Sequence, residues 1–229
     1  MNTPSVKSSA DARTSAVTLI KLGGSLLDLP DVVTKLVDLL SRIHRPVVIP
    51  GGGAAADLVR SWDQRYGLAA KSSHKLAMAG MSFNALRLTK SCDRCCLVSD
   101  QRMAEAALQA GRIPIIDITA AVLEMERSMS SSPAPPESWD VTSDSIAAWL
   151  ARNLRADLWL LKSVRPGPDP RRHLDPGFET ASEGLTHVTW VSFRETPVWT
   201  TVLSLPLQEV ESGEQDGKSE INSDDRNNE

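Results

Sequence analysis

The sequence contains no apolar run that approaches the roughly 20 residues of a membrane-spanning helix. Its start, MNTPSVKSSADARTSA, lacks the hydrophobic core of a signal peptide. Cysteine is scarce: Cys92, Cys95 and Cys96 form one C-x-x-C-C cluster, with no second ligand pair at zinc-finger spacing. These absences argue against a membrane span, a secreted protein and a cysteine metal site. We expect a cytoplasmic protein in which Cys95 and Cys96 begin a buried strand.

The net charge is also small outside the C-terminal end. The formal net charge is −4, and residues 207–229 hold eight acidic and two basic residues. Subtracting their −6 from −4 leaves +2 for the rest of the chain. This weak basic bias permits an anionic substrate and argues against a nucleic-acid partner. We expect residues 207–229 to be a disordered acidic tail and residues 1–16 a disordered leader.

Short apolar runs and helical stretches alternate along the remainder, which we expect to form one domain over residues 17–206. The runs that predict strands are 17–22, 46–50, 95–99, 112–117, 157–164, 187–193 and 198–205. Helical spacing predicts helices at 30–43, from Gly53 to about Trp62, at 71–90, at 100–111 and from about Asp144, where Thr142 or Ser143 should cap the helix. Continuous apolar strands separated by helices predict a three-layer α/β/α sandwich with a mainly parallel central sheet.

Two of the predicted strands end in glycine-rich turns. Lys21 precedes Gly23 and Gly24 by a few residues, and residues 51–53 are three consecutive glycines. Ligands of open parallel sheets bind at the carboxyl ends of the strands. Glycine lets backbone N–H groups reach phosphate oxygens, and a following helix N-terminus adds a favourable dipole. Neither turn fits G-x-x-x-x-G-K-[ST] or G-x-G-x-x-G. One Gly-Gly pair alone is usually only a tight turn, but two such turns beside a lysine indicate phosphate binding.

Four stretches resemble motifs of the amino acid kinase superfamily, which includes acetylglutamate kinase, aspartokinase, uridylate kinase and isopentenyl phosphate kinase. They are IKLGGSL (20–26), VIPGGGAAADLV (48–59), WDVTSDSIAA (139–148) and LLKSV (160–164). They occur in the family order, and the similarity covers roughly residues 17–204. The resemblance implies the amino acid kinase (carbamate kinase-like) fold and ATP-dependent phosphoryl transfer.

The resemblance also implies roles for individual residues. Lys21 matches the lysine that holds the transferring phosphoryl group, and Asp144 matches the aspartate that orients the lysines. A purely structural helix cap would place an aspartate at the same position as Asp144. The residues that match the first phosphate loop are Gly23, Gly24 and Ser25, and those that match the acceptor-side loop are Gly51, Gly52 and Gly53.

On the nucleotide side the sequence departs from the larger family members. Many of them have threonine or serine and then aspartate where this chain has Lys162-Ser163, and their D-G-V loop is R-P-G here. Lys162 either adds positive charge for the ATP phosphates or is a strand-end lysine with its head in solvent. The nucleotide-binding residues expected here are Lys162, Ser163, Val164, Gly167 and Asp169. Mg²⁺ should bind together with ATP, because no cluster of carboxylates offers an all-protein cage.

Within the superfamily, residues 62–68, 74–79, 105–114 and 138–151 resemble the small aminomethylfuran phosphate kinases of methanofuran biosynthesis. The implied acceptor is (5-(aminomethyl)furan-3-yl)methyl phosphate, which is converted to the diphosphate. Asp140 stands where acetylglutamate kinase has an asparagine that contacts substrate, so it would bind a cationic group of the acceptor. Alternatively, Asp140 only bonds the backbone of its own turn. His74 either faces the acceptor pocket or is a packed helix residue.

Other functions stay open at this stage. A uridylate, isopentenyl phosphate or acetylglutamate kinase would use the same fold. A non-catalytic nucleotide-binding storage or regulatory protein would keep the fold without turnover, although Lys21 and Asp144 argue against it. The partners expected are ATP and a small phosphorylated acceptor, within a homo-oligomer, and neither nucleic acid nor a membrane.

Overall fold

The computed structural model describes residues 17–127, 135–185, 187–195 and 202–205, the last of these as backbone only. The expected leader and acidic tail lie outside the described residues, as does most of the Pro- and Ser-rich segment before residue 138. None of the described helices is both long and apolar enough to cross a membrane.

All seven described strands belong to one sheet in the order β3-β4-β2-β1-β5-β6-β7. Every neighbouring pair is parallel except β6 and β7, which are antiparallel. The mainly parallel sheet expected from the apolar runs is therefore confirmed. The strands are β1 (Thr18–Leu22), β2 (Pro46–Pro50), β3 (Cys95–Val98), β4 (Ile113–Ile116), β5 (Asp157–Lys162), β6 (Val188–Ser192) and β7 (Val202–Leu205).

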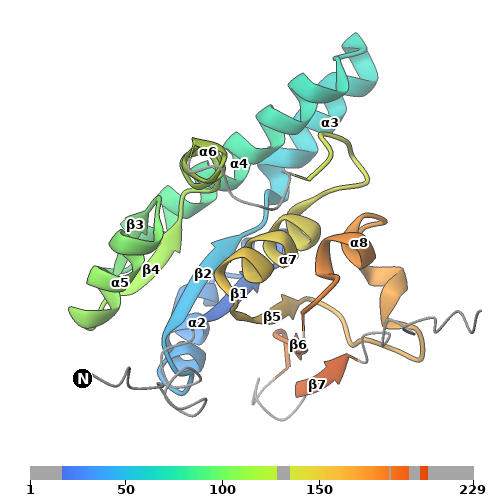
Figure 1. Cartoon of the computed structure of the whole chain (residues 1–229). Coiled ribbons are helices and arrows are strands. Elements are labelled where there is room, and N and C mark those ends of the chain that lie inside the picture. Colours follow the sequence, from blue (N-terminus) through green and yellow to red (C-terminus); the bar gives the residue numbers. More distant parts are fainter. Residues whose placement is uncertain (1–16, 128–134, 186, 196–201, 206–229) are drawn as a thin grey trace, which may run out of the picture.

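The helices follow the predicted pattern with two additions (Figure 1). They are α2 (Val32–Leu40), α3 (Gly53–Tyr66), α4 (Ala70–Lys90), α5 (Gln101–Gln109), α6 (Ile118–Arg127), α7 (Ser143–Leu154) and α8 (Phe178–Ser182), with 3-10 turns η1 (Gly24–Leu26) and η2 (Pro170–His173). Sequence reasoning missed α6, which starts directly after β4, and the short α8. It also ended α3 too early: the helix continues to Tyr66, where Gly67 closes it with φ 62°.

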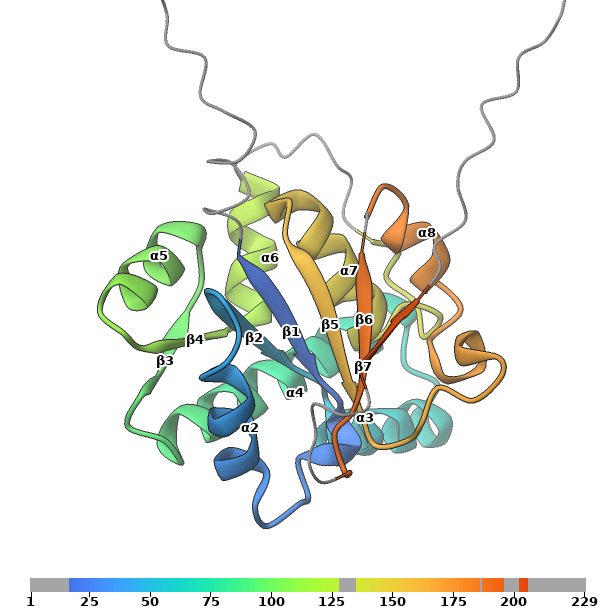
Figure 2. The ribbon, with the colours of Figure 1, turned by 90° about the horizontal axis from the view of Figure 1, so that it is seen from below.

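Strand alternation divides the core into two layers, one on each face of the sheet. Leu19 of β1 packs in the layer that contains α6 and α7, whereas Ile20 packs in the layer that contains α2. Figure 2 shows α2 on one face of the strands and α6 and α7 on the other. Because successive side chains point to opposite faces, Lys21 shares the face of Leu19 and Lys162 shares the face of Leu160. Both lysines therefore point toward α7.

Helices α3 and α4 lie side by side and extend together beyond the sheet (Figure 1). Gly80 allows this packing, because a Cβ placed there would come within 3.0 Å of the Ala55 side chain. The α4 helix then runs past the carboxyl ends of the central strands, and Met81 and Ala85 contribute to the two different core layers. The middle of α4 is therefore fixed directly beside the glycine turn that follows β2.

Candidate active site

Two lysines share one buried carboxylate at the carboxyl ends of β1 and β5. The Nζ of Lys21 lies 2.8 Å from Oδ1 of Asp144 in an ion pair, and the Nζ of Lys162 donates a hydrogen bond to Oδ2. Asp144 is the second residue of α7, and it and Lys21 are only 4% and 3% exposed. The pairing follows from the fold, since both strands aim their lysines at the N-terminal turn of α7.

The protonation states of this cluster follow from its charges. Burial by itself raises the pKa of Asp144, but the ammonium groups of Lys21 and Lys162 outweigh it and hold the pKa below its ordinary value. Burial and the charge of Lys21 lower the pKa of Lys162 below the usual lysine value, although Asp144 opposes them. The formal charges of the three side chains, one negative and two positive, give the cluster a net positive charge, which suits an anionic ligand.

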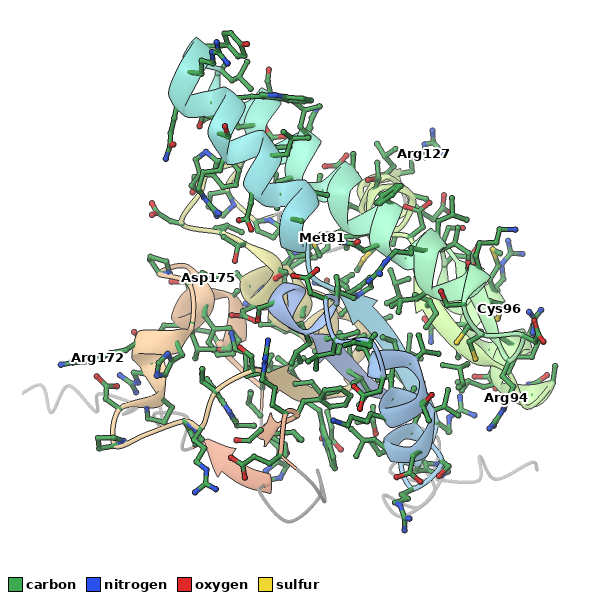
Figure 3. The ribbon with its side chains drawn as sticks, turned by 180° about the vertical axis from the view of Figure 1, so that it is seen from behind. Met81, Arg94, Cys96, Arg127, Arg172 and Asp175 are labelled. Atoms are coloured by element: carbon green, nitrogen blue, oxygen red, sulfur yellow. The ribbon has the colours of Figure 1, made fainter. Side chains whose placement is uncertain are left out.

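A second aspartate fixes the end of α7 that carries Asp144. The carboxylate of Asp175 accepts hydrogen bonds from the N–H of Thr142 at 3.0 Å and from the N–H of Ser145 at 3.2 Å, and also from both hydroxyl groups. Thr142 is the N-cap residue as predicted, but its side chain does not cap the helix. Asp175, labelled in Figure 3, does so from the segment before α8. The predicted capping mechanism was wrong because a residue distant in sequence supplies the acceptor.

The two glycine turns contact each other through their backbones. A Cβ on Gly24 would lie 2.4 Å from the Gly53 nitrogen, and a Cβ on Gly51 would lie 2.7 Å from the Gly24 nitrogen. Gly53 also has φ 49°, a conformation that favours glycine. Gly23 donates its N–H to Leu161 of β5 at 2.9 Å, which ties the first turn to the neighbouring strand. Glycine is required here because the backbones of the two turns approach too closely for any side chain.

A hydroxyl pair connects the first turn to the end of β5. The Ser25 hydroxyl donates to the Ser163 hydroxyl at 3.0 Å, and Arg194 donates to the Ser25 carbonyl at 3.2 Å. Three strand ends, those of β1, β5 and β6, therefore meet at this turn. Ser25 and Ser163, which the sequence assigned to two different loops, are brought together.

A cavity of about 360 Å³ opens from the glycine turns toward α4. Its lining residues from the turns and α3 include Gly24, Ser25, Asp28, Gly52, Gly53, Asp57 and Arg60, and those from α4 and the start of α7 include His74, Met78, Met81, Trp139, Val141 and Ser143. One wall is held by Trp139, whose indole N–H donates to Asp63 while the Arg60 guanidinium lies 4.7 Å from its ring centroid. A larger cavity of about 940 Å³, between α5, α6 and α7, contains none of the predicted site residues, so cavity size alone does not locate the site.

The two predicted substrate residues have different positions. His74 is buried on the wall of the cavity, with its Nδ1 3.4 Å from the Ser138 carbonyl. Asp140 is exposed and is not on that wall, which passes instead through its neighbours Trp139 and Val141. The backbone N–H of Asp140 donates to the Ser138 hydroxyl and its carbonyl accepts the N–H of Gly177. These bonds do not involve the Asp140 carboxylate, so both sequence-based interpretations of that side chain stay predictions.

The predicted nucleotide-side residues are only partly gathered. Val164 follows Lys162 and Ser163 at the end of β5, and its carbonyl accepts the indole N–H of Trp190 at 3.0 Å. The Trp190 ring also lies 5.5 Å from the Nζ of Lys162. Gly167 and Asp169 lie farther along an exposed loop, where Asp169 pairs with Arg172 at 3.1 Å. Lys162 therefore does not have its head in solvent, which answers one question that the sequence left open.

Sequence reasoning missed Asn84, Asp175 and Trp190. Asn84 is buried on α4 and donates to the carbonyls of Gly51 and Gly52 at 2.9 and 2.8 Å. A polar residue on the same helix face as Gly80, Met81 and Leu88 was a signal that could have indicated it. Asp175 and Trp190 gave no local signal, because their partners are distant in sequence.

Among the described residues, no three His, Cys, Asp or Glu side chains gather in a group that could hold a metal ion. The acidic side chains that line the cavity are Asp28 and Asp57, and both are exposed. A divalent ion that enters with nucleotide phosphates needs few protein ligands, since Mg²⁺ keeps several waters. The donor set therefore fits an ion carried by a phosphate ligand rather than a resident metal.

The sequence model of the amino acid kinase family matches residues 16–166, which include both glycine turns, Lys21, Asp144 and Lys162. The chain belongs to the amino acid kinase family. Phosphoryl transfer from a nucleotide such as ATP is the activity that this family implies for the chain. The resemblance that the four motifs indicated is thereby confirmed.

Solved structures are similar in fold. The UMP kinase from Bacillus anthracis superposes with a TM-score of 0.53 and 15% identity, over 79% of this chain and 88% of that one. The uridylate kinase from Archaeoglobus fulgidus gives a TM-score of 0.45 and 18% identity over 65% of this chain, which spans 64% of that kinase. At such identity the likeness shows the fold alone. A search of curated proteins finds no significant match.

Proposed function

We propose that this amino acid kinase transfers the γ-phosphoryl group of ATP to the phosphate of a small acceptor, most specifically (5-(aminomethyl)furan-3-yl)methyl phosphate. An oxygen of the acceptor phosphate attacks the γ-phosphorus, and the bond from that phosphorus to the bridging oxygen of ADP breaks. The products are a diphosphate and ADP. Mg²⁺, bound to the ATP phosphates, supplies further neutralisation of charge.

The observation that carries this proposal is the shared carboxylate between Lys21 and Lys162. Phosphoryl transfer requires positioning and neutralisation of charge more than covalent chemistry by the protein. Asp144 fixes two ammonium groups at the ends of β1 and β5, where their charge can stabilise the transferring group. Ser25 and Ser163, with the N–H group of Gly24, lie on the ATP side in this proposal, and the N–H groups of Gly52 and Gly53 face the acceptor.

The size and lining of the cavity support a small acceptor. Its volume of about 360 Å³ is near the lower end of the range for ligand pockets, which is about 300–1,000 Å³. Arg60, which pairs with Asp57 at 2.8 Å, can also pair with an anionic group, and the carboxylate of Asp28 can pair with an amine. His74 offers a ring nitrogen on the opposite wall. An acceptor with both a phosphate and an amine would use both kinds of group.

A coupled assay for ADP tests the proposal. The purified protein, ATP and Mg²⁺ should release ADP with the aminomethylfuran phosphate and much more slowly with UMP, isopentenyl phosphate or acetylglutamate. Lys21→Ala is the control for contaminating kinases. Faster turnover of UMP would assign the protein to uridylate kinase chemistry. Nucleotide binding without turnover of any of these acceptors would favour a storage or regulatory role.

A homo-oligomer is also proposed, supported by one face of α3. Leu58, Trp62 and Tyr66 are spaced by four residues, so they share a helix face, and each is at least 41% exposed. Sedimentation velocity of the full chain tests this directly. A monomer at micromolar concentration would contradict it.

A further inference from the structure

The acceptor-side glycine turn is held from behind by one amide side chain. Asn84 lies in the middle of α4 and is 6% exposed. Its Nδ2 is 2.9 Å from the Gly51 carbonyl and 2.8 Å from the Gly52 carbonyl. Two carbonyl oxygens can be satisfied only by the NH₂ end of the amide, so the orientation of the side chain is fixed by its partners. Both hydrogens of that NH₂ group are used on the turn.

These bonds set the direction of two peptide planes. In a planar trans peptide the C=O and the N–H point to opposite sides. The Gly51 carbonyl shares its plane with the Gly52 N–H, and the Gly52 carbonyl shares its plane with the Gly53 N–H. Asn84 holds both carbonyls on its own side of the turn, so both N–H groups face away from it. Gly52 and Gly53 line the cavity, whereas Asn84 does not.

The two planes differ in how many groups hold them. The Gly52 carbonyl also accepts the N–H of Ala56 at 3.3 Å, as the first turn of α3 requires. For the Gly51 carbonyl, Asn84 is the donor found within the described residues. Within the same part of the chain, no side chain caps the start of α3, and the N–H groups of Gly52 and Gly53 have no protein acceptor. They are therefore available to a ligand.

We infer that Asn84 is a positioning residue for the acceptor: it aims the N–H groups of Gly52 and Gly53 at the acceptor phosphate. The inference rests on the proposed phosphate kinase function and adds a residue to it. The close packing of α4 on α3 at Gly80, one helical turn before Asn84, brings this short side chain within reach of the turn. Asn84 acts through the glycines and touches no reacting atom.

The chain offers a matched control on the same helix. Ser82 also anchors α4 through its side chain, since its hydroxyl donates to Asp117 at 2.6 Å and accepts the N–H of Thr119 at 3.1 Å. Its partners lie at the start of α6 rather than in the glycine turn. Ser82→Ala therefore removes tertiary hydrogen bonds of α4 without changing the planes that Asn84 holds. The two variants separate a positioning role from a general structural one.

The test follows the backbone amides directly, with inorganic phosphate as the probe. In ¹⁵N-labelled full-length protein, the Gly52 and Gly53 amide resonances should shift on titration with phosphate. Asn84→Ala should raise the phosphate dissociation constant about tenfold or more, whereas Ser82→Ala should change it by less than about twofold. In the ADP assay, Asn84→Ala should raise the acceptor KM and lower kcat, with the KM for ATP nearly unchanged. If Asn84→Ala does not fold, Asn84→Asp provides the same test. It keeps the shape of the side chain but lacks the NH₂ donors, so the same changes in phosphate affinity and KM are expected.

The outcomes distinguish this inference from the proposed function. If the wild-type Gly52 and Gly53 amides do not respond to phosphate, the anion site and the positioning role both fail. If the wild type responds and folded Asn84→Ala responds equally, only the positioning role fails. Equal losses of phosphate affinity in Asn84→Ala and Ser82→Ala would also overturn it, because a general loosening of α4 would then account for both.

Discussion

The lysine cluster and the acceptor-side turn bind phosphate in this proposal by opposite means. The cluster of Lys21, Asp144 and Lys162 uses buried full charges on three different elements. The turn at residues 51–53 uses backbone dipoles, which an uncharged amide from α4 orients. The comparison shows that one site can use different groups for two tasks: charged side chains neutralise the phosphate, and oriented backbone N–H groups position it. Charges should then control rate, whereas the turn should control the fit of the acceptor.

The largest effect should come from Asp144→Ala, which leaves two buried ammonium groups without their counter-ion. We expect the free energy of unfolding to fall by about 3–5 kcal/mol and turnover to be lost. Urea denaturation measures the first effect and the ADP assay the second. Asp31→Ala is the matched control, because it breaks the exposed pair with Lys35 and should change stability by only about 0–1 kcal/mol. Equal changes in the free energy of unfolding of the two variants would show that Asp144 is not needed to balance the charge of the buried lysines.

Lys21→Ala should lower kcat by about 10²–10³-fold while ATP affinity changes little, because its charge matters most as negative charge moves in the transition state. Steady-state kinetics and calorimetry with a non-hydrolysable ATP analogue measure the two quantities. Lys35→Ala, at a partly exposed position of α2, controls for loss of a lysine in general. Near wild-type turnover in Lys21→Ala would remove this residue from the site.

Gly24→Ala should disturb both the first glycine turn and the turn at residues 51–53, because the added Cβ would lie 2.4 Å from the backbone nitrogen of Gly53. Forcing the turns apart should cost about 1–3 kcal/mol, and both ATP and acceptor affinities should fall. Gly111→Ala is the control. Gly111 has φ 69° and open space around it, so this variant measures the cost of backbone strain without a steric clash. An effect on only one of the two substrates would show that the turns move independently.

The pH profile should separate the two regions without disturbing the packing. Burial, with the charge of Lys21, lowers the pKa of Lys162, so its ammonium group loses its proton at a pH below the usual lysine value of about 10.4. The sign is therefore a fall in kcat/KM as pH rises through this lowered value. Lys162→Arg should have lower activity at neutral pH but no alkaline fall, because arginine stays charged. Lys35→Arg should keep the wild-type profile, and an alkaline fall that persists in Lys162→Arg would assign it to another group.

The smallest effect should come from the carboxylates that face the acceptor. Asp28 lies on the cavity wall, whereas Asp140 does not. Asp28→Asn should raise KM for the amine-bearing acceptor severalfold, as expected for one charge-assisted hydrogen bond that is exposed to solvent, and leave an acceptor without the amine unaffected. The same measurement on Asp140→Asn tests the sequence-based hypothesis for that residue. If only Asp140→Asn raises the KM for the amine-bearing acceptor, Asp140 binds the acceptor amine.

Much of the fold could be predicted from the sequence because its signals are local. Apolar runs such as 46–50 coincide with strands, and the glycine turns indicated the edge of the sheet at which we propose that phosphate binds. The lysine cluster was predictable only through family resemblance, because Lys162 and Asp144 meet across two elements. Asn84 and Asp175 could not be assigned roles, since each acts on backbone more than 29 residues away in sequence. Periodicity reports which face of a helix is buried, not which carbonyls that face meets.

The contact between Gly24 and Gly53 has a consequence for how this enzyme can change. The two turns pack directly on each other, so in the proposed mechanism the spacing between the donor and acceptor sites is set by contact between two backbones and includes no side-chain length. Substitutions on α4 or on the segment before α7 can reshape the cavity for a different acceptor without altering that spacing. Divergence of acceptor specificity is thus uncoupled from the distance over which the phosphoryl group travels.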